Sequence, residues 1–127
     1  MTRRRHVPRR DTSSQRSSRL NELLREIIAD ELTRIDDPRL TWVRVSHVRT
    51  DSSLDRAVVY FTEALADADT ESELVAVFEE HRSRLQRAVS NQARLRRTPP
   101  LVFEPDDQLR TAERIEDILR QVGDDEE

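Results

Sequence analysis

The segment from residue 81 to 103 constrains the fold most, because its backbone preference changes from helix to strand within a short distance. Its first half places residues of one face at helical spacing (i, i+3, i+4, i+7), namely Leu85, Ala88, Val89 and Gln92. Thr98-Pro99-Pro100 then ends the pattern, since proline lacks an amide donor and restricts the residue before it. The apolar run Leu101-Val102-Phe103 is typical of a strand. The sequence therefore predicts a helix followed closely by a strand.

The same helix has a cationic side. Six arginines with no acid between them occupy this region: Arg82, Arg84, Arg87, Arg94, Arg96 and Arg97. At about 100° per residue, Arg84, Arg87 and Arg94 fall on a stripe beside the apolar face, so we expect them to reach solvent freely. A solvated charged face is the ordinary explanation of a charge run. Here the run has a single sign within a chain of net charge −4, which favours binding of phosphate by all six.

Charge is also segregated elsewhere in the chain. Residues 1–19 hold seven arginines and one acid, residues 63–80 hold seven acids and no arginine, and residues 104–127 hold ten acids and three arginines. These blocks indicate an oriented molecule with one cationic side. Residues 1–17 lack apolar periodicity and are predicted to be a disordered basic tail. The tail is either solubilising or an RNA-binding arm that uses Arg3, Arg4, Arg5, Arg9 and Arg10.

Several classes of protein are disfavoured by composition. The chain has no cysteine, so it forms neither a disulfide nor a thiolate metal site, which fits a cytoplasmic protein. No apolar run approaches the roughly 18 residues of a membrane span. The single glycine, Gly123, excludes a glycine-rich phosphate loop. We expect no membrane contact, cofactor, metal or small-molecule substrate.

The first half of the chain reads as a helix followed by a hairpin. A helix is predicted from about Ser18 to Ile35, and Asp36-Asp37-Pro38 ends it. A strand follows over residues 40–49, with a bulge because Val48 is out of phase. Trp42 is expected in the core, since base stacking would require an exposed ring. The second strand, residues 57–62, is apolar on both faces and is therefore expected to be central.

A kink is predicted between the next two helices. The first begins at an N-cap, Thr70. If it continued straight, His81 and Arg82 would lie toward its apolar side, and burying an unpaired guanidinium is very costly. A bend at His81-Arg82-Ser83 removes this conflict. After the strand, a last helix is predicted from about residue 106 to 122, with an apolar stripe of Leu109, Ala112, Ile115, Ile118, Leu119 and Val122.

The predicted order is helix-strand-strand-helix-kink-helix-strand with a C-terminal helix. Three strands with helices on one face make an α+β fold. The helix-kink-helix-strand unit resembles type II KH domains, which bind single-stranded nucleic acid. We expect a KH-like RNA-binding domain over residues 18–122 and an acidic tail over residues 123–127.

Catalysis is not expected, because no nucleophile has a base placed beside it. The three histidines are His6, His47 and His81. His47 follows Ser46, but neighbours in a strand point to opposite faces. No paired-histidine helix or acidic metal loop is present in the sequence.

Four stretches together resemble the bacterial ribosome-binding factor A family across about residues 18–122. They are Asp37-Pro38-Arg39; Val43-Arg44-Val45-Ser46-His47-Val48 before Asp51; Leu54, Ala57, Val59 and Tyr60; and Leu95-Arg96 through Pro99, Leu101, Phe103 and Asp106 to Arg114-Ile115-Glu116-Asp117-Ile118-Leu119. The family's kink usually reads Ala-x-Gly, and His81-Arg82-Ser83 occupies that place here.

The resemblance implies a non-catalytic assembly factor of type II KH-like fold. Such a protein binds the immature 30S subunit, contacts 16S rRNA and promotes maturation of the rRNA 5′ end; we expect it to act as a monomer. Two other functions stay open: a general single-stranded RNA-binding module, or a protein-interaction module that uses the C-terminal helix.

Overall fold

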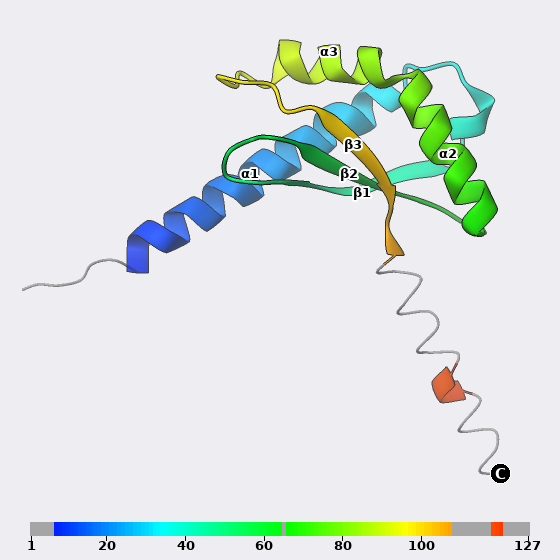
Figure 1. Cartoon of the computed structure of the whole chain (residues 1–127), viewed down its shortest axis with the longest axis horizontal. Coiled ribbons are helices and arrows are strands. Elements are labelled where there is room, and N and C mark those ends of the chain that lie inside the picture. The colour runs from blue at the N-terminus through cyan, green and yellow to red at the C-terminus, as the bar shows by residue number, and fades with distance from the viewer. Residues whose placement is uncertain (1–6, 65, 108–117, 121–127) are drawn as a thin grey trace, which may run out of the picture.

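The computed structural model describes residues 7–64, 66–107 and 118–120. The chain forms a long helix, a hairpin, two helices and a third strand (Figure 1). In order, the elements are α1 (Val7–Leu32), the short 3₁₀ helix η1 (Pro38–Leu40), β1 (Val43–Thr50), β2 (Ala57–Glu63), α2 (Ala68–Glu80), α3 (Arg82–Gln92) and β3 (Leu101–Pro105). This order confirms the predicted succession from the first helix to the third strand.

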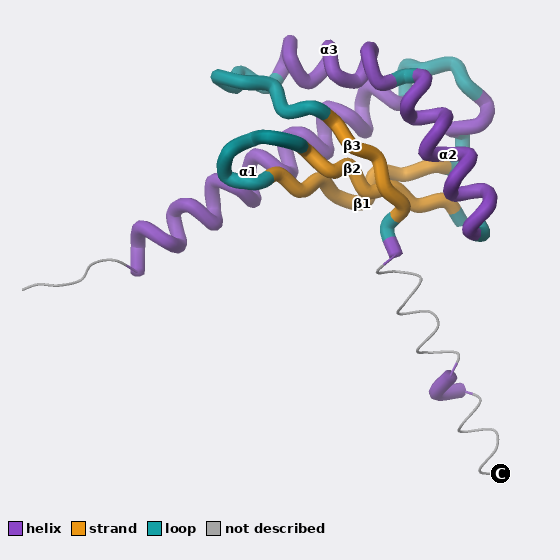
Figure 2. The backbone as a smooth tube through the Cα atoms, in the orientation of Figure 1, coloured by secondary structure: helices purple, strands orange, loops and turns teal. Residues whose placement is uncertain are grey.

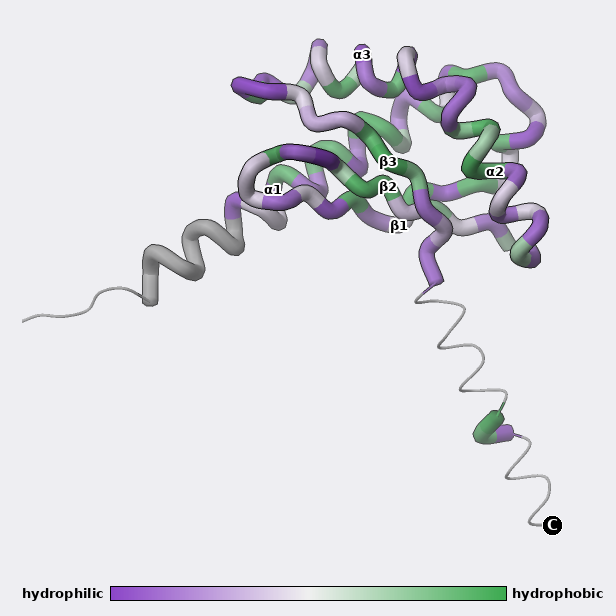
Figure 3. Tube along the Cα trace, viewed as in Figure 1, coloured by the Kyte–Doolittle hydropathy of each residue, from purple (hydrophilic) through white to green (hydrophobic). Residues whose placement is uncertain are grey.

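The three strands form one sheet in the order β1-β2-β3 (Figure 2). β1 and β2 are antiparallel, whereas β2 and β3 are parallel, so β2 is central as expected. One face of the sheet belongs to the core with α1, α2 and α3, where Phe61, Phe78 and Phe103 stack in a row. Figure 3 shows the hydrophobic residues along β2 and at the start of β3. Within the described part of the chain, the helices therefore cover one face of the sheet and leave the other to solvent.

The first helix begins earlier than predicted. α1 starts at Val7 rather than near Ser18, so part of the segment expected to be disordered lies in the helix. Pro8 is compatible with the first turn, where an amide donor is not needed, and neither proline nor glycine follows until the helix ends. Residues 8–19 of the sequence include no apolar residue other than Pro8, which explains why apolar spacing placed the start too late. Asn21 then fastens the helix to β1 by accepting hydrogen bonds from both Thr50 N and Thr50 Oγ1.

The predicted bulge in β1 is confirmed. Val45 pairs with Phe61 and His47 pairs with Tyr60, so Ser46 is the extra residue. Beyond the bulge, Val48 returns to the core face opposite Val59. The bulge thus restores the apolar phase and places His47 on the solvent face.

The interruption between α2 and α3 is confirmed and lies at His81. α2 ends at Glu80 and α3 starts at Arg82, with His81 at φ −101° and ψ 9° between them. The start of α2 differs from the prediction, because Asp67 is the N-cap and its side chain accepts a hydrogen bond from Thr70 N. Asp67 and Thr70 are both favourable N-cap residues. The turn after β2 determines at which of them the helix begins.

Trp42 is not in the core: its relative exposure is 75%. It directly precedes β1, and its neighbour Val43 is the residue that packs against the core. Most of the predicted C-terminal helix lies outside the described residues; Asp107 and residues 118–120 are helical, and Ile118 and Leu119 are exposed. Within the described part of the chain, no helix is both long and apolar enough to span a membrane.

Candidate nucleic-acid interface

α3 presents one buried and one charged side. Leu85, Ala88 and Val89 are buried against the sheet and α1, as the spacing predicted. The six arginines expected to bind phosphate lie on α3 and the loop that follows, but they divide into two groups. Arg82 and Arg84 are engaged within the protein, whereas Arg87, Arg94, Arg96 and Arg97 are exposed.

Arg82 joins α3 to its neighbours. Its guanidinium forms a two-pronged ion pair with Glu79, with both nitrogen–oxygen distances at 2.7 Å. It also donates to the Leu101 carbonyl and lies over the Phe103 ring, 5.5 Å from the centroid. The Glu79 carboxylate raises the pKa of Arg82. The bend at His81 thus lets Arg82 fasten the start of β3 to α3, which occupies its donors.

Arg84 is not free in solvent, contrary to the expectation. Its Nε lies 2.7 Å from Glu31 Oε2, and its Nη2 donates to the Arg34 carbonyl at 3.1 Å. Both partners lie at the C-terminal end of α1, which packs beside α3. The periodicity of α3 predicted correctly that Arg84 points away from the apolar face of the helix. It did not predict the partners that Arg84 meets beside α1.

The other four arginines form the exposed set, Arg87, Arg94, Arg96 and Arg97. Among the described residues, Arg87, Arg94 and Arg96 have no acidic partner. Arg97 is 3.5 Å from Asp55, with both side chains more than half exposed, and a pair of this kind contributes little. Guanidinium groups that are exposed and uncompensated can form bidentate contacts to phosphate. We call these four residues the cationic face.

Gln86 positions the loop that carries most of the cationic face. Its Nε2 donates to the Pro99 carbonyl at 2.8 Å, and its Oε1 accepts from Leu101 N at 3.1 Å. A shallow groove of about 520 Å³ lies beside it, lined by Ser83, Gln86, Arg87, Ser90, Thr98 and Pro100. The role of Gln86 was not predicted from the sequence, because nothing in the sequence distinguishes this glutamine from any other that lies beside an apolar stripe.

The bend is held from outside by a charged network. His81 Nε2 lies 2.8 Å from Asp37 Oδ2, and Arg39 binds both Asp37 and Glu80. Arg39 first, and then His81, hold the pKa of the Asp37 carboxyl well below its usual range. Asp37, expected to be only part of the stop of the first helix, therefore fixes the junction between α2 and α3 together with Arg39.

The side chains of the arginines near the N-terminus are not among those that the structure describes. Arg3, Arg4 and Arg5 lie outside the described residues. Arg9 and Arg10 lie within the span of α1, but their side chains lie outside the description. Their role as an RNA-binding arm stays a prediction.

Ser46, His47 and Asp106 come together at the bulge, although Ser46 and His47 were expected on opposite faces. Ser46 Oγ donates to Asp106 Oδ2 at 2.5 Å, while His47 Nδ1 is 3.4 Å from the same oxygen. A catalytic serine needs its proton taken by the histidine, yet here the hydroxyl bonds the carboxylate directly. The cluster instead joins the end of β3 to β1. Within the described residues, no group of three or more potential ligands could hold a metal ion.

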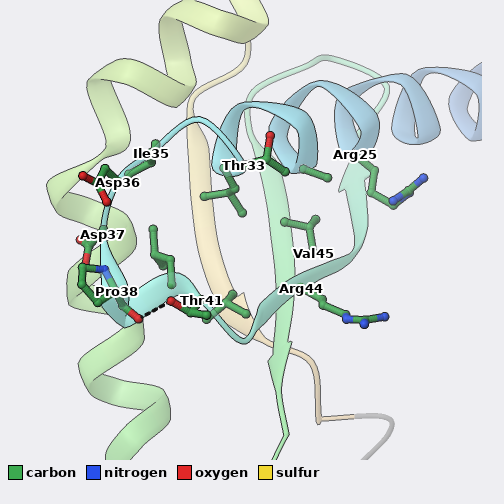
Figure 4. Close-up of a pocket in the computed structure, with 13 residues that line it drawn as sticks. Arg25, Thr33, Ile35, Asp36, Asp37, Pro38, Thr41, Arg44 and Val45 are labelled. Carbon is green, nitrogen blue, oxygen red and sulfur yellow. Dashed lines mark hydrogen bonds between the residues drawn. The ribbon is translucent and has the colours of Figure 1, made fainter.

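A larger groove, of about 710 Å³, lies between α1 and the first half of β1 (Figure 4). Its lining mixes polar and apolar side chains, and one end is closed by the turn in which Thr41 Oγ1 donates to the Pro38 carbonyl. Arg25 and Arg44 point outward at the other end. Arg25 is paired with Glu22, whereas Arg44 has no acidic partner in the described part of the chain.

Comparison with known proteins places these features in one family. The family model for "Ribosome-binding factor A" matches residues 16–119. A curated relative of that name from Rubrobacter xylanophilus is 38% identical over 112 residues, covering 87% of this chain and 90% of the relative.

Solved structures agree with the sequence comparison. The crystal structure of ribosome-binding factor A from Thermus thermophilus matches with a TM-score of 0.62 and 26% identity, over 70% of this chain and 93% of that one. A Thermus thermophilus homology model fitted into the cryo-EM map of a 30S–RbfA complex matches with a TM-score of 0.56 and 26% identity, over 68% and 90%.

Proposed function

The chain belongs to the ribosome-binding factor A family, and on this premise we propose that it binds the immature 30S ribosomal subunit through 16S rRNA and promotes maturation of the rRNA 5′ end. Members of the family are non-catalytic assembly factors. The Thermus thermophilus relative fitted into the map of a 30S complex supports the choice of partner.

The observation that carries the proposal is the cationic face. Arg87, Arg94, Arg96 and Arg97 gather on α3 and its following loop in a chain of net charge −4. Arginine binds phosphate in a planar, two-pronged manner, and each phosphate neutralised releases counterions. Such contacts supply affinity and orientation rather than sequence choice. The shape of the immature particle then supplies specificity.

The remaining details belong to the same proposal. The protein acts in the cytoplasm as a monomer, without a cofactor, small-molecule substrate or membrane. The N-terminal arginines extend the contact as an arm, and residues 18–122 form the binding domain. The lack of cysteine and of a long apolar run in the sequence is consistent with this setting.

The decisive experiment is co-sedimentation of the full-length protein with purified immature 30S particles, mature 30S, 50S and 70S ribosomes. We expect selective pelleting with immature 30S and loss of pelleting for the triple variant R87E/R94E/R96E. Circular dichroism and the denaturation midpoint verify that the variant is folded. Equal binding to every particle would indicate a general RNA-binding module, and unchanged binding by the folded variant would exclude the cationic face.

The processing step needs a separate readout. In cells depleted of the protein, the ratio of precursor to mature 16S rRNA 5′ ends is measured by primer extension. We expect precursor ends to accumulate, and to be cleared by the wild-type chain but not by the triple variant. Normal 5′ ends in depleted cells would limit the function to subunit binding.

A further inference from the structure

The solvent face of the sheet carries a row of aromatic and cationic side chains along β1. Arg44, His47 and Arg49 pair across the sheet with Thr62, Tyr60 and Val58, and these pairs alternate with core pairs such as Val45 with Phe61. The three β1 residues therefore share the face opposite to the helices. Trp42 directly precedes β1, so strand alternation does not orient it, and we count it with the row because it is exposed two residues before Arg44. At about 3.3 Å per residue, residues 42–49 span roughly 20 Å.

Trp42 is the one ring of this row that is open to a ligand. The His47 and Tyr60 rings are stacked on each other at 4.3 Å, and Arg49 lies over Tyr60 at 5.8 Å from its centroid. Those groups cover one another and close the middle of the face. The indole of Trp42, in contrast, is 75% exposed. An exposed indole beside cationic side chains offers a flat surface on which a base can stack.

The charges around Trp42 fit an anion. Arg44 is two residues away, is exposed, and has no acidic partner among the described residues. Arg49 makes a cation–π contact with Tyr60 but no ion pair within the described chain. Of the nearby acids, Glu104 pairs with Tyr60 from β3, and Asp106 accepts from Ser46 and lies 3.4 Å from His47, so both lie at the middle of the face rather than beside Trp42. Glu63 pairs with Val43 and so belongs to the helix-covered side.

The row also continues toward the cationic face. Past Arg49 the hairpin turns, and Arg56 is exposed there without an acidic partner in the described part of the chain. Asp55 in the same turn approaches Arg97, and Ala57 N donates to the Pro100 carbonyl at 2.9 Å. The hairpin end and the arginine-bearing loop are therefore neighbours. A strand of RNA leaving the cationic face would reach the sheet at this end.

We propose that the solvent face of β1, from Trp42 to Arg49, is a second RNA-binding surface that takes an unpaired stretch of RNA. One base stacks on the Trp42 indole, the phosphate next to it binds Arg44, and a phosphate further along the strand binds Arg49. Stacking on an exposed aromatic ring beside cations is the general mode of single-strand binding. This surface goes beyond the proposed function, which uses the opposite side of the sheet, and it selects unpaired over paired RNA.

The test uses the fact that Trp42 is the only tryptophan in the chain, so its fluorescence reports this ring alone. Full-length protein is titrated with a short oligoadenylate, and then with the same strand annealed to oligouridylate. We expect saturable quenching by the single strand and little quenching by the duplex. Binding of labelled oligoadenylate, followed by anisotropy, should weaken roughly 5- to 150-fold for Trp42→Ala, the range for loss of one stacked base.

Two variants complete the comparison. Arg44→Gln should reduce the slope of log affinity against log salt by about 0.7, as for one single-strand phosphate. Leu23→Ala removes another exposed apolar side chain, on α1, and should leave affinity unchanged. The proposal is overturned if saturating oligoadenylate leaves the emission unchanged, or if Trp42→Ala binds it as tightly as the wild type. Quenching by a polylysine peptide or by self-association in its place would make the surface a protein contact and would also overturn it.

Failure of this proposal is distinct from failure of the proposed function. The triple variant R87E/R94E/R96E should lose binding to the immature 30S subunit yet keep the full quenching amplitude at saturating oligoadenylate. If the wild-type protein failed to pellet with 30S particles but was still quenched, the second surface would stand and the proposed function would fall.

Discussion

Asp37 determines how the junction between α2 and α3 responds to pH. Arg39, then His81, depress the pKa of its carboxyl. A carboxyl of this kind stabilises the fold above its unfolded pKa of about 4, and that contribution is lost as the pH falls toward the folded pKa. We therefore expect Asp37→Asn to lower the urea midpoint at pH 7, with the gap to wild type closing below about pH 4.

The matched control is Asp36→Asn, since Asp36 is exposed and has no partner among the described residues. Its midpoint should follow that of the wild type at every pH. A gap for Asp37→Asn that stayed constant from neutral to acid pH would show that the carboxylate charge is not what holds the junction.

A second prediction concerns Gln86. Replacing it with leucine keeps a similar volume but leaves Leu101 N and the Pro99 carbonyl without their partner. Partly buried groups that lose a hydrogen bond cost about 1–3 kcal/mol. We expect that loss in urea denaturation, together with weaker 30S binding because the loop bearing Arg94, Arg96 and Arg97 is released. Gln92→Leu, at the exposed last position of α3, should leave both measurements unchanged.

The sequence predicted the direction of each arginine on α3 but not its partners. Arg87 is exposed on α3 where the spacing placed it, whereas Arg94 was expected on the same helical stripe but lies in the loop after α3 ends at Gln92. Arg84 was expected to be free, but it is paired with Glu31. Glu31 is 53 residues away in the sequence, and the two side chains meet only because α1 packs beside α3. Trp42 fails as a core residue because it precedes the strand whose alternation would have oriented it. Both errors concern the surroundings of a side chain in the folded protein, which the period of a single helix or strand does not determine.

At the scale of elements, the bulge and the bend were predictable because each resolves a conflict of phase within one segment. Val48 is out of phase with Val45 unless a residue is inserted, and the structure inserts Ser46. The parallel pairing of β2 with β3 was not predicted, because it depends on how two intervening helices return the chain. The early start of α1 was missed because residues 8–19 of the sequence contain no apolar side chain other than Pro8, so they show no helical period.

α1 leads to a prediction about deletion of residues 1–15. The deletion removes the beginning of the helix and keeps the core residues that the structure describes in it, Leu24, Ile27 and Ile28. We expect an almost unchanged melting temperature, a smaller helical signal in circular dichroism, and weaker 30S binding with a flatter salt dependence. A clear fall in melting temperature would mean that these residues pack on the domain; unchanged binding would make the tail solubilising.

At the scale of the whole molecule, the two signs of charge lie on different elements. The cationic face belongs to α3 and its loop, whereas α2 and the segment before it hold the acids of residues 63–80. If only the net charge of the whole protein mattered, a net charge of −4 would disfavour RNA binding. At physiological salt the screening length is about 8 Å, so each face acts largely by itself.

This separation predicts the salt dependence of binding to the 30S subunit. Four phosphate contacts, one for each residue of the cationic face, should give a slope of log affinity against log salt of roughly −3 to −3.5. Arg94→Gln with Arg96→Gln should flatten that slope by roughly 1.5, because two contacts are lost. Asp69→Asn with Glu73→Gln on α2 changes net charge by the same amount in the opposite sense and should leave the slope unchanged. If the two pairs instead shifted affinity equally and oppositely, binding would follow net charge, and no particular face of the protein would be the RNA-binding face.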